Sequence, residues 1–169
     1  MPCGCIVDRP TYPQNEEWGS LIWSILHTMA EQAGKQTSSL QSQDEKRAWP
    51  LFQKALIDIL PCPYCRDHYK EWMTANPFVL PVNYSEWNGY IRAWFWTLHE
   101  HVNQSLGKPS FPFEDLTSTY KSGATLTYKF MQLEMLELRA IQNGWRKSLE
   151  MGRMEETISY AAVFLWNLI

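Results

Sequence analysis

The sequence predicts an all-α fold, because apolar residues recur at steps of three and four, alternating strand patterns are nearly absent, and glycine and proline interrupt the apolar stretches. The chain has 169 residues, which suffices for one domain, or for one domain with an added segment. Hydrophobic residues make up 45% of the sequence and charged residues 20%, and this balance indicates a globular core instead of a disordered chain.

The N-terminal part is expected to be an arm followed by a first helix. Residues 1–15 contain three prolines and the pair Cys3 and Cys5, which indicates an extended arm. The first helix is expected to begin near Glu17 and to end at Gly34. Its buried face is marked by Trp18, Ile22, Ile25, Leu26, Met29, Ala30 and Ala33.

A second and a third helix are expected on either side of Pro61. The polar stretch 35–46 is expected to be a loop or a loose helix start. Apolar residues at helical spacing then follow: Trp49, Phe52, Ala55, Leu56, Ile59 and Leu60. Pro50 suits the first turn of this helix, or else kinks a helix that begins earlier. Pro61 ends it, and the third, short helix runs from the Cys62-Pro63-Tyr64-Cys65 segment to Asn76–Pro77.

A long fourth helix is expected after the loop at 78–84. Ser85 is a plausible N-cap, and Gly107 followed by Pro109 is the expected stop signal. The apolar marks of this helix are Trp87, Ile91, Trp94, Leu98, Val102 and Leu106.

The last part of the chain is expected to be irregular over residues 110–124 and then helical over about 125–150 and 155–169, with Gly152 between the two stretches. The apolar run at 159–169 is about eleven residues long, which is too short to span a bilayer. No window of about 18 apolar residues occurs elsewhere, so no membrane span is predicted.

Charge and composition exclude several classes of function. A net charge of −3 argues against a general nucleic-acid binder. Residues 1–15 lack the apolar middle region of a secretory signal. Only eight glycines are present, so a glycine-rich nucleotide loop is not expected, whereas aromatic residues reach 14%. This aromatic excess favours a flat cofactor held between helices.

The four cysteines fall into two close pairs, a number that fits redox or metal chemistry better than a disulfide-stapled fold. Cys62 and Cys65 stand at the start of a predicted helix, where unpaired backbone N–H groups and the helix dipole lower thiol pKa values. Arg66 adds positive charge. The pair therefore predicts a reactive dithiol that opens and closes as a disulfide.

The cysteines also allow other interpretations. A zinc site formed by Cys3, Cys5, Cys62 and Cys65 is one alternative, and a helical dithiol carrier without flavin is another. A thioredoxin-type fold is disfavoured, because only about fifteen residues separate Cys65 from Pro81, too few for the helix, strand and second helix that this fold requires.

Three segments resemble the flavin-dependent sulfhydryl oxidases of the Erv/ALR type, including the short versions carried by large DNA viruses. The first is Gly19-x-x-x-Trp23-x-x-Leu26-His27-x-Met29-Ala30. The second is Pro61-Cys62-x-x-Cys65-Arg66-x-His68-Tyr69. The third is His99-x-x-Val102-Asn103-x-x-Leu106-Gly107-Lys108-Pro109. The chain departs from the family at Glu100, where the family usually has asparagine, and it lacks the second structural disulfide of the cellular members.

The resemblance implies a four-helix bundle that binds FAD over residues 16–115, preceded by the arm at 1–15 and followed by a helical extension at 116–169. It implies that Cys65 is the thiol nearest the isoalloxazine and that Cys62 exchanges with a shuttle dithiol, here Cys3 and Cys5. The residues that it implies around FAD are Gly19, Trp23, His27, Cys65, His68, Tyr69, His99, Val102, Asn103 and Lys108, with no metal ligand among them.

The expected activity is therefore disulfide formation in protein thiols, with electrons passing through the two cysteine pairs to FAD and then to oxygen, which becomes hydrogen peroxide. The alternative is a zinc-binding helical interaction module. The resemblance also implies a homodimer. Expected partners are protein thiols, among them viral structural or redox proteins, and no nucleic acid. The expected location is the host cytoplasm or the virion of a virus.

Overall fold

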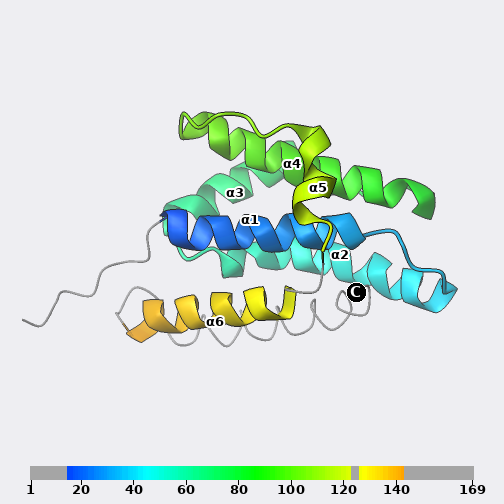
Figure 1. Cartoon of the computed structure of the whole chain (residues 1–169), viewed down its shortest axis with the longest axis horizontal. Helices are drawn as coiled ribbons and strands as arrows, with labels where there is room; N and C mark the ends of the chain where they lie inside the picture. Colours follow the sequence, from blue (N-terminus) through cyan, green and yellow to red (C-terminus); the bar gives the residue numbers. More distant parts are fainter. Residues whose placement is uncertain (1–14, 123–125, 143–169) are drawn as a thin grey trace, which may run out of the picture.

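The computed structural model describes residues 15–122 and 126–142, and within these ranges it contains helices and no strand (Figure 1). The α-helices are α1 (Asn15–Gln32), α2 (Ser39–Ile59), α3 (Pro63–Ala75), α4 (Trp87–Ser105), α5 (Leu116–Tyr120) and α6 (Leu126–Gln142). Two 3₁₀ turns, η1 (Tyr84–Glu86) and η2 (Phe113–Asp115), precede α4 and α5. The all-α class predicted from the sequence is confirmed.

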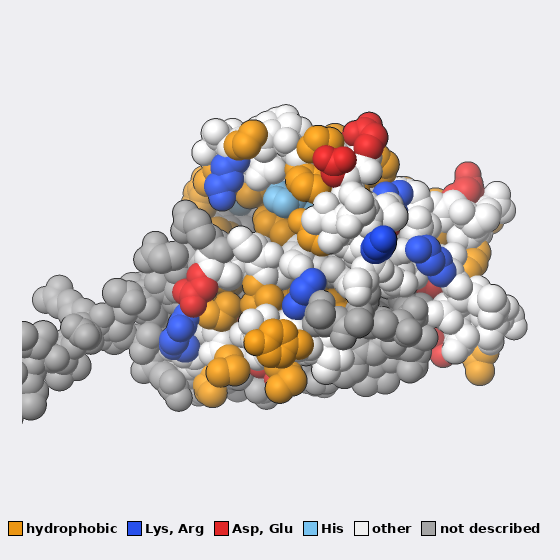
Figure 2. All heavy atoms as spheres, viewed as in Figure 1, with side chains coloured by type: hydrophobic (Ala, Val, Ile, Leu, Met, Phe, Trp, Pro, Cys, Tyr) orange, Lys and Arg blue, Asp and Glu red, His pale blue; other side chains and the backbone are white. Residues whose placement is uncertain are grey.

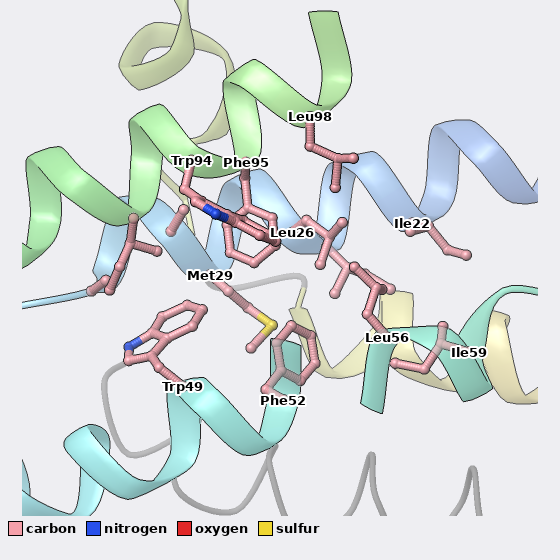
Figure 3. Packing of buried hydrophobic residues seen from close by; sticks show 14 of the residues in the cluster. Ile22, Leu26, Met29, Trp49, Phe52, Leu56, Ile59, Trp94, Phe95 and Leu98 are labelled. Atoms are coloured by element: carbon pink, nitrogen blue, oxygen red, sulfur yellow. The ribbon is translucent and has the colours of Figure 1, made fainter. Parts of the chain in front are cut away.

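Helix α1 lies at the centre of the structure and contacts α4, α5 and α6 (Figure 1). The core forms where large side chains of α1, α2 and α4 meet, as the close view in Figure 3 shows. Trp49 of α2 lies with its ring centroid 6.1 Å from that of Phe95 of α4, and Leu26 and Met29 of α1 are almost completely buried beside them. The apolar faces predicted for these helices are the faces that pack, with the exception of Leu106, which follows the end of α4 and is exposed.

Helix α1 ends at Gln32, shortly before Gly34, the residue predicted to stop it. Gly34 has φ +69°, a conformation that favours glycine, and a Cβ atom there would lie 2.9 Å from the backbone nitrogen of Asn88. The Asn88 side-chain amide donates hydrogen bonds to the carbonyls of Ala30, Glu31 and Ala33 at 2.9–3.2 Å. A side chain of α4 thus donates to carbonyls at the end of α1, among them that of Ala30, which also accepts from the Ala33 backbone N–H at 3.2 Å.

Helix α2 begins at Ser39, so it already includes most of the stretch for which a loop or a loose helix start was predicted. Pro50 consequently lies inside the helix, and the first-turn position considered for it is wrong. The polar stretch is helical because Glu45 is buried and its carboxylate accepts hydrogen bonds from the Gly34 backbone and the Trp49 indole. The contact between Glu45 and Gly34 therefore stabilises the first half of α2, and the pattern of apolar residues gives no sign of it.

Two further boundaries differ from the sequence-based expectation. Ser85 lies within η1 and does not cap α4, which begins at Trp87. The segment expected to be irregular contains η2 and α5, and Leu116 of α5 is buried. Helix α5 is only five residues long, too short for the 3.6-residue pattern to reveal it.

Helix α6 confirms the helical stretch expected after residue 125 as far as Gln142. Its residues Leu126, Phe130 and Leu133 belong to the same core as α1, whereas Tyr128, Met131, Met135 and Leu138 are exposed. Figure 2 shows hydrophobic side chains gathered on the surface over this helix. The rest of the expected helical stretches, with Gly152, lies outside the described residues. Among the described helices, none combines the length and the apolar character that crossing a membrane requires.

Candidate active site

A cavity of about 420 Å³ lies among side chains of α1, α3 and α4, with further contributions from α2, α5 and the segment after α4. Its size falls in the range of small-molecule sites in proteins. The aromatic and imidazole rings that line it are Trp18, Trp23, Tyr64, His68, Tyr69, Trp72, His99, His101 and Tyr120. Such a lining suits a planar, partly apolar ligand.

The cavity brings together residues from all three sequence segments that were singled out. Those that line it are Gly19, Trp23, Cys62, Cys65, His68, Tyr69, His99, Val102, Asn103 and Lys108. His27 is not a lining residue, but its ring stacks beside His99 with centroids 5.1 Å apart. Cys3 and Cys5 lie outside the described residues.

The dithiol stands at the start of α3, as predicted. Cys62 is the N-cap residue, and its Sγ accepts a hydrogen bond from the backbone N–H of Cys65 at 3.3 Å. Pro63 occupies the first position of the helix. A backbone N–H there would have no partner within the helix, so the missing N–H of proline costs no hydrogen bond. Both cysteines are free thiols and partly buried.

The acidity expected for Cys65 is wrong. Burial, followed by the hydrogen bond and the charge interaction with Cys62, raises the pKa of Cys65 to about 12, although the neighbouring Arg66 acts in the opposite direction. The backbone N–H of Cys65 also acts to lower this pKa, but the loss of water around the sulfur and the neighbouring Cys62 outweigh it. At neutral pH Cys65 is therefore a thiol that needs a base.

Three rings stack against one another beside the dithiol cavity. Trp23 and His99 are nearly parallel, at an interplanar angle of 8° and a centroid distance of 4.0 Å. His27 Nε2 lies 2.8 Å from His99 Nδ1, so the two imidazoles share a hydrogen bond. Burial, with His99 as the second cause, lowers the pKa of His27 to about 3, and burial also lowers the pKa of His99 to about 4. Both rings are neutral at pH 7 and form a flat, uncharged wall.

Because His27 is buried as a neutral ring, the protein is expected to lose stability in acid. The unfolded chain binds a proton below about pH 6.5 that the folded chain does not bind until about pH 3, so the stability present above pH 6.5 is lost as the pH falls through this interval. His27 alone should lower the free energy of unfolding by up to about 1.4 kcal/mol per pH unit.

Urea unfolding at pH 7, 6 and 5 measures this loss, and the His27→Gln variant is the control because its amide does not titrate in this range. The variant should show the shallower dependence on pH. Parallel curves for the two chains would contradict the assigned cause.

Tyr69 is held with its ring in the cavity wall by hydrogen bonds at its hydroxyl. The hydroxyl donates to the backbone carbonyl of Gln53 at 2.8 Å, and burial raises the pKa of Tyr69 above its usual range. The phenol therefore stays protonated, and its hydroxyl is hydrogen-bonded to the backbone of α2.

Sequence reasoning missed two polar residues of α4 near the cavity. His101 lines it, and His101 Nε2 lies 3.1 Å from His68 Nε2. Glu100, noted only as a departure from the family pattern, accepts hydrogen bonds from the Ser110 hydroxyl and from the Phe111 backbone at 2.8 Å. It thus fastens the segment that follows Lys108 to α4. Both residues directly follow His99 in the sequence, but no periodicity or spacing there indicated their partners.

Comparisons with known proteins agree with this geometry. The model of the Erv1/Alr family matches residues 20–121. The "FAD-linked sulfhydryl oxidase ERV1" of Oryza sativa subsp. japonica is 31% identical over 107 residues, which cover 62% of this chain and 50% of that protein. The protein of the same name from Arabidopsis thaliana is 32% identical over 110 residues, which cover 63% of this chain and 52% of that protein.

A viral relative is matched over most of its own length. The "FAD-linked sulfhydryl oxidase" of African swine fever virus is 28% identical over 119 residues, which cover 70% of this chain and 92% of that protein. The chain spans only about half the length of the two plant relatives. No solved structure matches the chain significantly. Since the family match covers more than half of the sequence and includes the helices that surround the cavity, the chain belongs to the Erv1/Alr family.

Proposed function

We propose that this chain is an FAD-linked sulfhydryl oxidase, which forms disulfides in protein thiols and reduces molecular oxygen to hydrogen peroxide. The observation that carries the proposal is a CxxC dithiol in the wall of an aromatic-lined cavity, on a helical framework. The printed names of the relatives agree with it.

The residues around the cavity fit a flavin. Gly19 leaves open space, because a Cβ atom there would meet nothing within 4 Å. The indole Nε1–H of Trp18, a lining residue, is buried and has no hydrogen-bond partner. Lys108 offers a positive charge for a phosphate. When bound, FAD supplies a two-electron acceptor that oxygen reoxidises. The proposed FAD-binding residues are Gly19, Trp23, His27, Cys65, His68, Tyr69, His99, Val102, Asn103 and Lys108.

The two cysteines of α3 carry out the sulfur chemistry. Closing the disulfide between Cys62 and Cys65 releases two electrons and two protons. We assign Cys65 the contact with the cofactor, and Cys62, the N-cap residue, the exchange with an incoming disulfide. Nothing observed favours the zinc alternative: within residues 15–122 and 126–142, no three His, Cys, Asp or Glu side chains are grouped so that they could hold a metal ion.

The purified protein tests the proposal directly. It should be yellow, with the visible absorbance of an oxidised flavin, and should consume oxygen when a dithiol is added. A colourless chain that cannot be reconstituted with FAD would contradict the proposal, and metal release to a chelator would support the zinc alternative instead.

Replacing Gly19 by phenylalanine is expected to remove FAD without unfolding the protein. The new ring would enter the cavity and clash with bound FAD. A clash that costs about 1–3 kcal/mol weakens FAD binding roughly 10- to 100-fold. Gly89→Phe is the matched control, because Gly89 is also helical and open around its Cβ but does not line the cavity. Flavin content per chain measures the effect, and equal content in both variants would refute the assignment of the site.

We also propose that Cys3 and Cys5 form a dithiol relay, which takes electrons from client proteins and passes them to Cys62 and Cys65. A disulfide across a CxC pair is strained and oxidising, which suits a relay. The double variant Cys3→Ser/Cys5→Ser should be slow with a reduced protein as substrate and normal with dithiothreitol. If both substrates are oxidised at wild-type rates, the relay is excluded.

The finer features of the assembly are proposals as well. We propose a homodimer, which light scattering would reveal as twice the chain mass. We propose that the clients include viral structural or redox proteins in the host cytoplasm or the virion, and the match with a viral relative supports this. A mixed disulfide trapped with Cys5→Ser in infected cells would identify the clients.

A further inference from the structure

We infer that His68 and His101 form a proton-carrying pair, which accepts protons released by the Cys62–Cys65 dithiol and passes them to a second cavity that the pair also lines. The inference rests on the proposed oxidase function, because only a dithiol that closes repeatedly needs a route for its protons.

The geometry of the pair requires a shared proton. The Nε2 atoms of the two rings are 3.1 Å apart and the ring centroids 5.0 Å apart. Neither nitrogen can donate to the other unless one of them carries hydrogen, so the contact is an N–H···N hydrogen bond with one proton between two acceptors. Such a pair passes a proton from ring to ring without moving either side chain.

The pair also belongs to the linings of two cavities. His68 and His101 line both the dithiol cavity and a broader cavity of about 780 Å³. The second cavity is lined by polar side chains as well, among them Glu71, Glu100, Gln104 and Ser110. A proton that reaches His101 is therefore next to a polar, water-accessible space.

His68 is well placed to receive the proton. It follows Cys65 by three residues on α3, so both side chains lie on one face of the helix, and both line the dithiol cavity. Because the pKa of Cys65 is raised to about 12, this thiol cannot lose its proton to water readily at neutral pH. His27 and His99 are poor acceptors, since burial lowers the pKa of each. Besides the pair itself, the titratable groups that line the two cavities are Cys62, Tyr64, Cys65, Tyr69, Glu71, His99, Glu100, Lys108 and Tyr120.

The step balances as follows. Cys62–SH and Cys65–SH give one disulfide, two protons and two electrons; bound FAD would supply the two-electron acceptor, and the two protons that oxygen needs to become hydrogen peroxide would come back from water. Each proton binds a free ring nitrogen of His68, the shared proton crosses to His101, and His101 releases a proton from its other nitrogen to water. Each transfer adds one proton to His68 and removes one from His101, so the pair holds as many protons afterwards as before. Both rings then return to their starting tautomers.

Two variants separate proton transfer from a purely structural contact between α3 and α4. Imidazole is small enough to enter the second cavity and replace the ring lost in His101→Ala. His101→Gln keeps a side chain that can hydrogen-bond to His68 but cannot carry a proton onward. Gln104→Ala, which alters the same cavity one turn further along α4, is the matched control.

The wild-type full chain is first shown to be yellow and to consume oxygen with dithiothreitol; failure here rejects the proposed function itself. Both His101 variants should then retain flavin but turn over at least about tenfold more slowly, as expected for loss of a proton carrier. Added imidazole should restore His101→Ala in proportion to the free base and should not affect Gln104→Ala. Wild-type turnover in His101→Gln, or no response of His101→Ala to imidazole, would overturn the inference while leaving the oxidase function intact.

A second readout does not depend on turnover. In the ¹⁵N spectrum of the oxidised full chain, the Nε2 signals of His68 and His101 should show a coupling across the N–H···N hydrogen bond, and His101→Ala should remove it. Absence of this coupling in the wild type would overturn the shared proton.

Discussion

Replacing Cys65 by serine is expected to lower the rate of thiol oxidation by about three orders of magnitude or more, while the chain keeps its flavin. A hydroxyl cannot form the disulfide with Cys62, so the two electrons of the dithiol cannot leave together. The local fold should persist, since the backbone N–H of residue 65 still donates to Cys62 Sγ and serine is slightly smaller than cysteine.

Oxygen consumption with dithiothreitol and the visible absorbance of the purified chain measure the two halves of this prediction. Thr74→Ala is a suitable control, because Thr74 lies exposed near the end of α3, and its hydroxyl donates only to the Lys70 carbonyl. A Cys65→Ser chain that oxidises thiols at the control rate would refute the assignment of the dithiol. Loss of flavin in this variant would mean that Cys65 is needed to hold the cofactor.

Glu45→Ala is expected to lower the free energy of unfolding by about 3 kcal/mol or more, the largest stability effect expected from a polar residue here. Its carboxylate accepts hydrogen bonds from the Gly34 backbone at 2.7 Å, the Trp49 indole at 2.9 Å and the Tyr84 hydroxyl at 2.6 Å. Alanine would leave the buried Trp49 indole and the half-buried Gly34 N–H and Tyr84 hydroxyl without this partner. Each buried donor left unpaired costs about 1–3 kcal/mol.

The neighbouring Asp44→Ala variant is the control for this prediction. Asp44 forms only a partly exposed ion pair with Arg47 at 3.7 Å, and pairs of this kind contribute about 0–1 kcal/mol. Urea unfolding of both variants gives the comparison. Equal loss of stability in the two would show that the Glu45 contacts do not hold α2 to the ends of α1 and η1.

The helices and the sequence segments of the site could be predicted because their signals are local. The apolar periodicity of α1 and α4, the glycines at 34 and 107 with φ near +66° to +69°, and the helix start at Cys62 all depend on residues a few positions apart. The start of α2 could not be predicted in this way. Its polar first half is held by Glu45, whose hydrogen-bond partners lie at Gly34, Trp49 and Tyr84.

The sequence by itself determined that the chain is helical, that a dithiol begins its third helix and that three segments match one family, since these properties are carried by residue type and spacing. Only the tertiary structure decided that Cys65 is a weak acid, that His27 and His99 are neutral and that His68 meets His101. The physical reason is that desolvation and hydrogen bonding are set by whatever side chains surround a group. Here those side chains come from helices far apart in the chain.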